Sequence, residues 1–107
     1  MSLKNIKFEI VSNDNNYEYS GLADFNKELI SFKDKDSYII DKTIKRIVKN
    51  KNEIVLDFIK KKIYLDDYKY DMDIIINKLE LDNNIDIEYV LGDNKIKIRM
   101  IEVDLNE

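Results

Sequence analysis

Histidine, cysteine and proline are absent from this chain of 107 residues, and glycine occurs only twice. Without cysteine there is no disulfide framework and no thiol nucleophile. Without histidine or cysteine, the usual zinc ligands and the Ser-His-Asp triad are excluded. The phosphate-binding motifs GxxxxGK[ST] and GxGxxG are also missing. The remaining carboxylates, lysines, tyrosines and serines form no catalytic constellation that stands out, so we expect a protein that is not an enzyme and needs no cofactor.

Long apolar runs are missing as well. No stretch approaches the roughly 20 apolar residues of a membrane-spanning helix, and the N-terminus lacks the basic-then-apolar order of a signal peptide. The net charge is −4 and there are only two arginines, Arg46 and Arg99, which argues against nucleic acid as a partner. We therefore expect a cytoplasmic protein without membrane or nucleic-acid partners. Its length predicts a single domain over residues 1–107, in which residues 1–3 are compatible with a cloning leader.

Isoleucine is the most abundant apolar residue, with 18 copies, whereas alanine occurs once, as Ala23. Isoleucine is β-branched and fits a pleated sheet better than a helix, and a chain almost without alanine is poor helix material. Because proline is absent and glycine is rare, we expect the turns to be formed by the 26 asparagine and aspartate residues. The composition therefore favours an all-β protein.

The clearest pattern lies between Ile85 and Val103. Two runs of alternating apolar and charged residues flank Gly92-Asp93-Asn94. Successive side chains on a strand point to opposite faces, so each run has one apolar and one charged face. Gly, Asp and Asn tolerate the positive φ of a tight turn. We predict an antiparallel hairpin whose acidic and basic faces lie opposite each other, with Asp86 and Glu88 against Lys95, Lys97 and Arg99.

Shorter alternating runs precede this hairpin, bounded by clusters of Asn, Asp and Lys. The strands predicted from them are 4–12, 17–25, 29–33, 53–59, 63–65 and 72–81. Residues 66–73 are predicted to be a polar connection. Residues 38–49 are ambiguous, because Ile40, Ile44 and Ile47 have helical spacing while the β-branched composition favours a strand, which we prefer.

Three features predict a strongly curved sheet. The apolar face changes side within residues 72–81 and again after Met100, and each change needs a β-bulge or strong coiling. Gly21 inside a predicted strand is typical of a bulge or a corner. Without proline to protect open edges, closure of the sheet is favoured. We expect one antiparallel β-barrel of about eight strands, with no internal repeat.

The order of these runs resembles that of a known family. The segments GLADFNKELISF, TIKRIV, EIVLDF, KKIYL and IDIEYVLGDNKIKIRM follow one another as in the small bacterial YwiB-like proteins. The likeness covers about residues 4–104 and rests on strand order and apolar placement. It implies an eight-stranded, lipocalin-like (calycin) barrel without catalytic residues, in a family with no established activity. Around residues 60–71 this chain is shorter than typical members, which bears on the size of any cavity.

One acidic cluster could in principle bind a hard cation through carboxylate oxygens. It consists of Asp66, Asp67, Asp71 and Asp73. The EF-hand spacing and its glycine are missing, so we interpret the cluster as a solvated loop and predict no metal site.

One basic cluster, residues 60–62, lies between Phe58 and Tyr64. Lysines interleaved with aromatic residues can bind single-stranded nucleic acid. In an acidic protein a turn or a protected edge strand is the simpler interpretation, and we prefer it.

The tyrosines suggest a ligand site. Tyr17, Tyr19 and Tyr89 fall on the predicted inward faces, and a buried tyrosine usually keeps its hydroxyl hydrogen-bonded. Such side chains could line an apolar cavity with a few polar groups; dense core packing is the alternative, because side chains can fill an eight-stranded barrel. We expect a small apolar or amphipathic ligand, and the candidate binding residues are Tyr17, Tyr19, Tyr89 and Phe58.

A second hypothesis is a protein–protein interaction module without a ligand cavity. It would use an exposed sheet edge or an outer apolar patch, and a homodimer is one form of it. The candidate residues are Leu22, Val55, Ile75 and Ile101. One architecture supports many functions, so the fold alone does not choose between the two hypotheses.

Overall fold

A computed structural model describes residues 2–104, which form one antiparallel sheet of eleven strands with no helix among them. The predicted all-β class and barrel-like sheet are confirmed, whereas the prediction of about eight strands is wrong. Over this range the structure contains no helix that could cross a membrane. The strands are β1 (Ser2–Val11), β2 (Asn16–Asn26), β3 (Leu29–Lys33), β4 (Ser37–Asp41), β5 (Arg46–Lys49), β6 (Ile54–Asp57), β7 (Lys62–Leu65), β8 (Tyr70–Asp73), β9 (Ile75–Leu81), β10 (Ile85–Leu91) and β11 (Asn94–Glu102).

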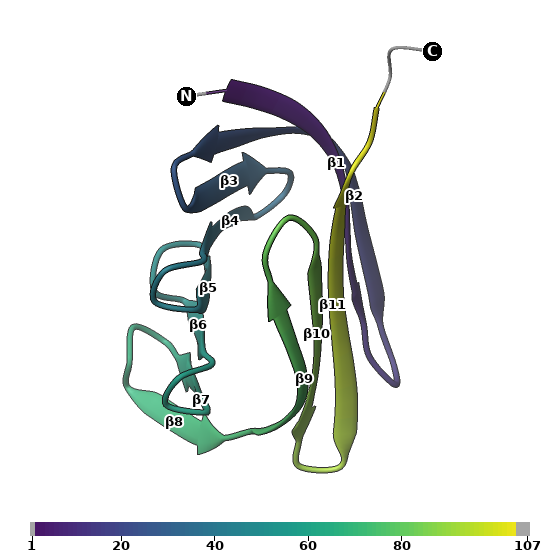
Figure 1. Ribbon diagram of the computed structural model, residues 1–107. Helices are drawn as coiled ribbons and strands as arrows, with labels where there is room; N and C mark the ends of the chain where they lie inside the picture. The colour runs from purple at the N-terminus through teal and green to yellow at the C-terminus, as the bar shows by residue number, and fades with distance from the viewer. Residues whose placement is uncertain (1, 105–107) are drawn as a thin grey trace.

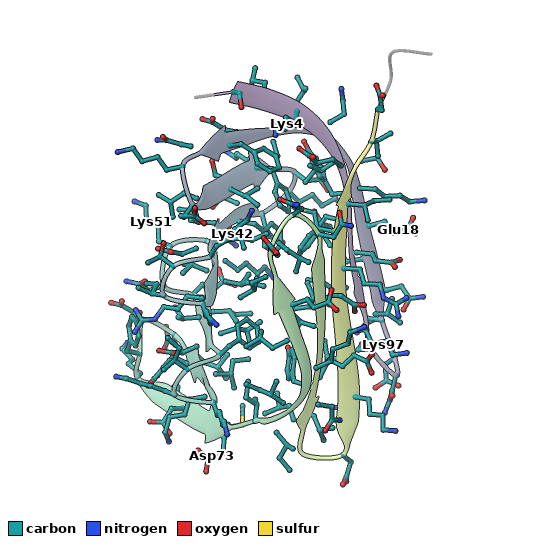
Figure 2. The ribbon with its side chains drawn as sticks, in the orientation of Figure 1. Lys4, Glu18, Lys42, Lys51, Asp73 and Lys97 are labelled. Carbon is teal, nitrogen blue, oxygen red and sulfur yellow. The ribbon has the colours of Figure 1, made fainter. Side chains whose placement is uncertain are left out.

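The sheet folds into two facing walls (Figure 1). The short-strand wall is the column of β3 to β8, and the long-strand wall consists of β9, β10 and β11 together with β1 and β2, which curve over one end. The first and last strands lie side by side within the sheet, because β1 pairs with both β2 and β11. Ser2 and Leu3, expected to be part of a leader, lie within β1. Figure 2 shows charged side chains such as Glu18 and Lys97 pointing outward from the long-strand wall.

The barrel is nearly closed where the two edge strands, β8 and β9, follow one another in the chain. Only Ile74 separates them; it is 4% exposed, and its backbone N–H donates to the carbonyl oxygen of Lys61 at 3.0 Å. The bulge predicted within residues 72–81 is confirmed. Lys78 pairs with Glu88 and Ile76 with Tyr89, so the pairing of β9 with β10 skips one residue of β9 and its apolar face changes side.

The predicted face change after Met100 is wrong, and of the two alternatives predicted for Gly21, a bulge or a corner, the bulge is wrong. The strand β11 keeps its register to Glu102, so Ile101 faces outward and is 48% exposed, while Leu105 lies outside the described residues. The pairing of β1 with β2 runs through Gly21 without a shift. Gly21 is needed for space instead, because a Cβ there would lie 2.7 Å from the hydroxyl oxygen of Tyr19.

The short-strand wall contains a structural repeat that was not predicted from the sequence. Strands β5, β6, β7 and β8 have four residues each. The loops that precede them, 42–45, 50–53, 58–61 and 66–69, also have four. Equivalent positions therefore recur every 16 residues. The prediction of no internal repeat is wrong because backbone geometry recurs here while few residue identities do.

This repeat explains the two segments that the sequence left ambiguous or misassigned. Residues 38–49 form two strands, β4 and β5, with a turn between them, so the preferred assignment to strand is correct but one strand was expected. The helical spacing of Ile40, Ile44 and Ile47 arises because the turn separates the two strands. The predicted polar connection 66–73 contains the strand β8. All four β8 residues are exposed, so burial does not distinguish the two faces of this strand, and its pairing with β7 defines it.

Two equivalent aspartates, 16 residues apart, close the turns of the repeat. One carboxylate oxygen of Asp41 accepts the backbone N–H of Thr43 at 3.0 Å and of Ile44 at 3.2 Å. Asp57 accepts the equivalent pair at 3.1 and 2.9 Å. Aspartate favours such turns because its side chain can accept from the backbone two residues further on.

Each of these turns ends on a lysine with positive φ, 55° at Lys45 and 58° at Lys61. A side chain in this conformation is strained by about 1 kcal/mol, whereas glycine is not. We therefore expect Lys45→Gly or Lys61→Gly to raise the free energy of unfolding by about 1 kcal/mol, measured by denaturant titration. The neighbouring Lys60→Gly is the matched control and should lower it, since Lys60 does not have positive φ. Destabilisation in all three variants would contradict the turn geometry.

Candidate functional site

An apolar cavity of about 170 Å³ lies between the two walls. It is the candidate ligand site because it is lined by inward-facing side chains of seven strands. The lining residues are Tyr38, Ile47, Lys49, Ile54, Leu56 and Ile63 from the short-strand wall, and Ile10, Tyr89 and Ile98 from the long-strand wall.

The strict register of the short strands places these residues. Ile40, Ile47, Leu56 and Ile63 are successive cross-strand partners and form one inward row. Tyr38, Lys49, Ile54 and Leu65 form the next inward row in the same way. Every member of the two rows is apolar or aromatic except Lys49, so this lysine brings a cationic group to the edge of an apolar cavity.

A small polar network fixes the position of Lys49. Its ammonium lies 3.5 Å from a carboxylate oxygen of Asp36, whose other oxygen accepts from the amide of Asn50 at 2.7 Å. The side-chain oxygen of Asn50 accepts the backbone N–H of Ser37 at 2.9 Å. The hydrogen bond from Asn50, and then Lys49, hold the pKa of Asp36 below its usual value. Asn50 has φ of 49°, which asparagine tolerates better than most residues.

The two cavity tyrosines keep their protons and have hydroxyls available to a ligand. Burial raises the pKa of Tyr89 to about 12. Burial also raises the pKa of Tyr38, and the negative charges of Asp36 and Asp34 add to the shift. Within residues 2–104 neither hydroxyl has a hydrogen-bond partner. The cavity therefore combines apolar walls with two hydrogen-bonding groups and one cation.

Of the four residues predicted to line a site, Tyr89 does so and the other three lie elsewhere. Phe58 is 2% exposed and packs edge-on against the ring of Tyr89, with centroids 6.3 Å apart. The ring of Tyr17 stacks on Tyr38 at 5.7 Å, and that of Tyr19 stacks on Phe32 at 4.7 Å. Dense packing, the alternative considered from sequence, therefore describes the part of the core around Tyr17 and Tyr19.

The hydroxyls of Tyr17 and Tyr19 have hydrogen-bond partners close by, whereas the hydroxyl of Tyr89 has none within residues 2–104. Tyr17 donates to a carboxylate oxygen of Asp34 at 3.3 Å, and Tyr19 donates to the carbonyl oxygen of Leu22 at 2.7 Å. Tyr38 and Lys49 were not predicted to line the site because both lie in the segment 38–49, whose pattern is ambiguous. Recognition of two four-residue strands in this segment would have placed both on one inward row.

The two charged clusters lie on neighbouring turns and strands around β7 and β8. No group of three or more acidic residues that could hold a metal ion occurs in the part of the chain that the structure describes. Asp71 and Asp73 instead share Lys62, at 3.3 and 3.1 Å. Lys61 belongs to a turn and Lys62 to β7, in agreement with the simpler interpretation of residues 60–62.

The candidates for an outer apolar patch divide into two groups. Leu22, Ile75 and Ile101 are exposed, at 51, 65 and 48%. Val55 is fully buried, so its assignment to an exposed patch is wrong. It points outward, but its cross-strand partners Val48 and Tyr64 flank it on both sides and exclude water.

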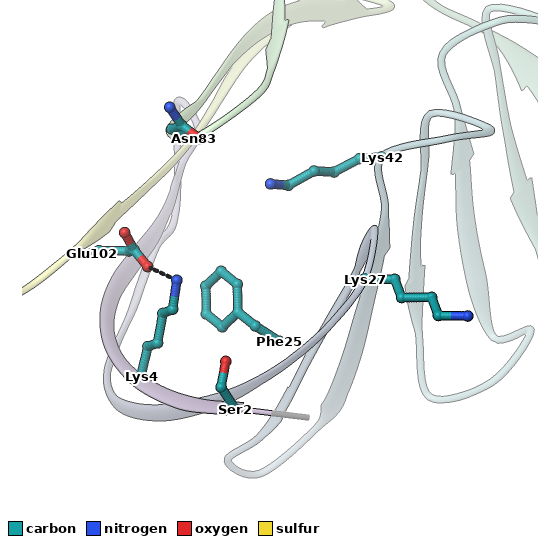
Figure 3. A pocket seen from close by; sticks show the side chains of 7 residues that line it. All are labelled: Ser2, Lys4, Phe25, Lys27, Lys42, Asn83 and Glu102. Carbon is teal, nitrogen blue, oxygen red and sulfur yellow. Dashed lines mark ion pairs between the residues drawn. The ribbon is translucent and has the colours of Figure 1, made fainter.

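A second, more open hollow of about 280 Å³ lies near the N-terminus (Figure 3). Lys4 pairs with Glu102 at 2.8 Å, and its ammonium lies 4.9 Å from the centre of the Phe25 ring. Figure 3 shows Lys42 reaching across the hollow, while Lys27 points away from it. The hollow is polar and cationic, in contrast to the interior cavity.

Comparison of the chain with protein-family models, with curated proteins and with solved structures found no match. The resemblance to the YwiB-like family therefore stays a prediction.

The raised pKa of Tyr89 makes stability depend on pH. The unfolded tyrosine ionises near pH 10.0, whereas the folded one stays neutral up to about pH 12. The contribution of neutral Tyr89 to the free energy of unfolding is therefore fully present below pH 10.0. It is lost as the pH rises from 10.0 to about 12, which lowers the free energy of unfolding by roughly 2 to 3 kcal/mol. We expect Tyr89→Phe to lose less stability than the parent protein between these pH values, measured by denaturant titration. Tyr70→Phe, at a side chain 64% exposed, should behave as the parent does, and identical pH profiles for all three proteins would contradict the buried position of Tyr89.

Proposed function

We propose that this protein is a non-enzymatic carrier or sensor that binds a small apolar molecule with one polar or anionic group inside its barrel. The observation that carries the proposal is the chemistry of the cavity. Six aliphatic side chains surround it, and its polar groups are Tyr38, Tyr89 and Lys49. Ligand sites are usually of this kind, mostly apolar with a few polar groups that orient the ligand.

The size of the cavity limits the ligand. An engineered apolar cavity of about 150 Å³ in another protein binds benzene, whereas sites for drug-sized ligands begin at roughly 300 Å³. A cavity of about 170 Å³ therefore suits a single ring or a short aliphatic chain, and a long acyl chain would require repacking of the core. This is a narrower ligand class than the sequence suggested.

The polar groups favour an anionic or hydrogen-bonding end on that ligand. Lys49 is held at the rim by Asp36 and can contribute a charge-assisted hydrogen bond to a carboxylate. The hydroxyls of Tyr38 and Tyr89 can donate to the same group. The expected lipocalin-like character of the barrel, although it remains a prediction, points to the same type of function.

A panel of small molecules tests this proposal. Toluene, benzoate and hexadecanoate would be compared by thermal unfolding and by amide chemical shifts in NMR spectra. We expect benzoate, at about ten times its dissociation constant, to raise the melting temperature by about 5 °C or more. Toluene should bind more weakly because it leaves the polar groups unused, and hexadecanoate should not bind.

Matched variants separate cavity binding from surface binding. Ile54→Trp should fill the cavity and abolish both interactions, whereas Ile39→Trp, at an outward position 43% exposed, should leave them unchanged. Lys49→Gln should reduce the affinity for benzoate to that for toluene. If no compound shifts the melting temperature, or if Ile54→Trp binds as the parent does, the proposal is wrong.

A further inference from the structure

The turns at one edge of the short-strand wall expose a row of aliphatic side chains. Leu29, Ile44 and Ile59 lie 15 residues apart and are 40, 44 and 62% exposed. Leu29 and Ile44 line one shallow surface groove, and Ile44 and Ile59 line the next. The three side chains are therefore neighbours on one surface, which we call the turn ridge and define as residues 27–29, 42–45 and 59–61.

The turn ridge is also cationic, although the whole chain has a net charge of −4. Five lysines occupy it, and within residues 2–104 none of them takes part in an ion pair; they are Lys27, Lys42, Lys45, Lys60 and Lys61.

The acidic groups beside these lysines are largely engaged. Asp41 accepts the backbone amides of its turn, and Asp57 binds Arg46 at 2.9 Å. Glu28 is the one carboxylate within the turn ridge itself. The lysine charges are therefore available to an anionic partner.

The shape of the turn ridge favours a partner whose surface is flat and deformable. Successive turns are two strands apart, so the three tips are spaced by about 10 Å and span about 20 Å in a line. A rigid protein would need a matching concave surface to contact all three tips. A lipid bilayer needs no matching shape, because its lipids rearrange around projecting side chains. It supplies both phosphate groups and an apolar interior.

We propose that the turn ridge docks this protein onto an anionic phospholipid bilayer. Ile44 and Ile59 insert among the headgroups, and the surrounding lysines contact lipid phosphates. The expectation from sequence that the membrane is not a partner rested on the absence of a spanning segment, which surface docking does not require. This proposal is independent of the ligand cavity, since the turn ridge shares no residue with it.

Co-sedimentation with vesicles tests the proposal. The parent protein should bind vesicles of phosphatidylcholine and phosphatidylglycerol at low salt, with weaker binding at higher salt and none to pure phosphatidylcholine. Lys45→Gln together with Lys60→Gln, two exposed lysines of the ridge, should weaken binding roughly thirtyfold, because each lysine near an anionic surface contributes about fivefold. Ile44→Ser together with Ile59→Ser should weaken it about tenfold.

The controls are chosen for equal charge and exposure. Lys33→Gln with Lys95→Gln removes two exposed lysines outside the ridge, and Ile39→Ser changes an isoleucine that is 43% exposed, compared with 44% for Ile44. Both controls should bind as the parent does, and circular dichroism checks that every variant is folded. Absence of binding to the anionic vesicles, or equal losses in ridge and control variants, would overturn the proposal.

Discussion

The buried pairing of Asp57 with Arg46 holds the short-strand wall together. Asp57 is 2% exposed and is the one charged side chain among residues 2–104 that is buried. One carboxylate oxygen closes the turn that follows, and the other accepts from two guanidinium nitrogens of Arg46 at 3.0 and 2.9 Å. A buried carboxylate is costly without such partners. Because Arg46 and Asp57 are direct cross-strand neighbours, a slip of one residue would leave the charge buried and unpaired.

That single register has consequences on both sides of the wall. On the outer side it aligns charges of alternating sign across five strands: Asp41, Arg46, Asp57, Lys62 and Asp73. On the inner side it aligns the apolar row that lines the cavity and the row in which Lys49 interrupts the apolar pattern. At the edge it stacks the turns so that Ile44 and Ile59 become neighbours. The proposed ligand site and the proposed membrane surface therefore depend on the same strand alignment.

The sequence predicted best where strands are long and one face is fully buried. The hairpin of β10 and β11 was predicted correctly, because each run alternates over seven or more residues. A four-residue strand has only two inward residues, so β5 and β8 were too short to be identified from their apolar pattern. In the site, Tyr89 was found because it lies in a long strand. Tyr38 and Lys49 were missed, since a lysine on an inward row contradicts the pattern that sequence analysis uses.

Native-state amide hydrogen exchange on Asp57→Asn is the most direct test of this account. The substitution preserves the shape of the side chain but removes the charge that Arg46 requires. We expect the free energy of unfolding to fall by about 3 kcal/mol, and exchange to accelerate first in β5, β6 and β7 while the β10–β11 hairpin keeps its protection. Asp41→Asn, which changes the equivalent turn but leaves the pair of Asp57 with Arg46 intact, should cost about 1 kcal/mol. Unchanged stability in Asp57→Asn, or equal acceleration in all strands, would contradict the claim that this pair fixes the register of the wall.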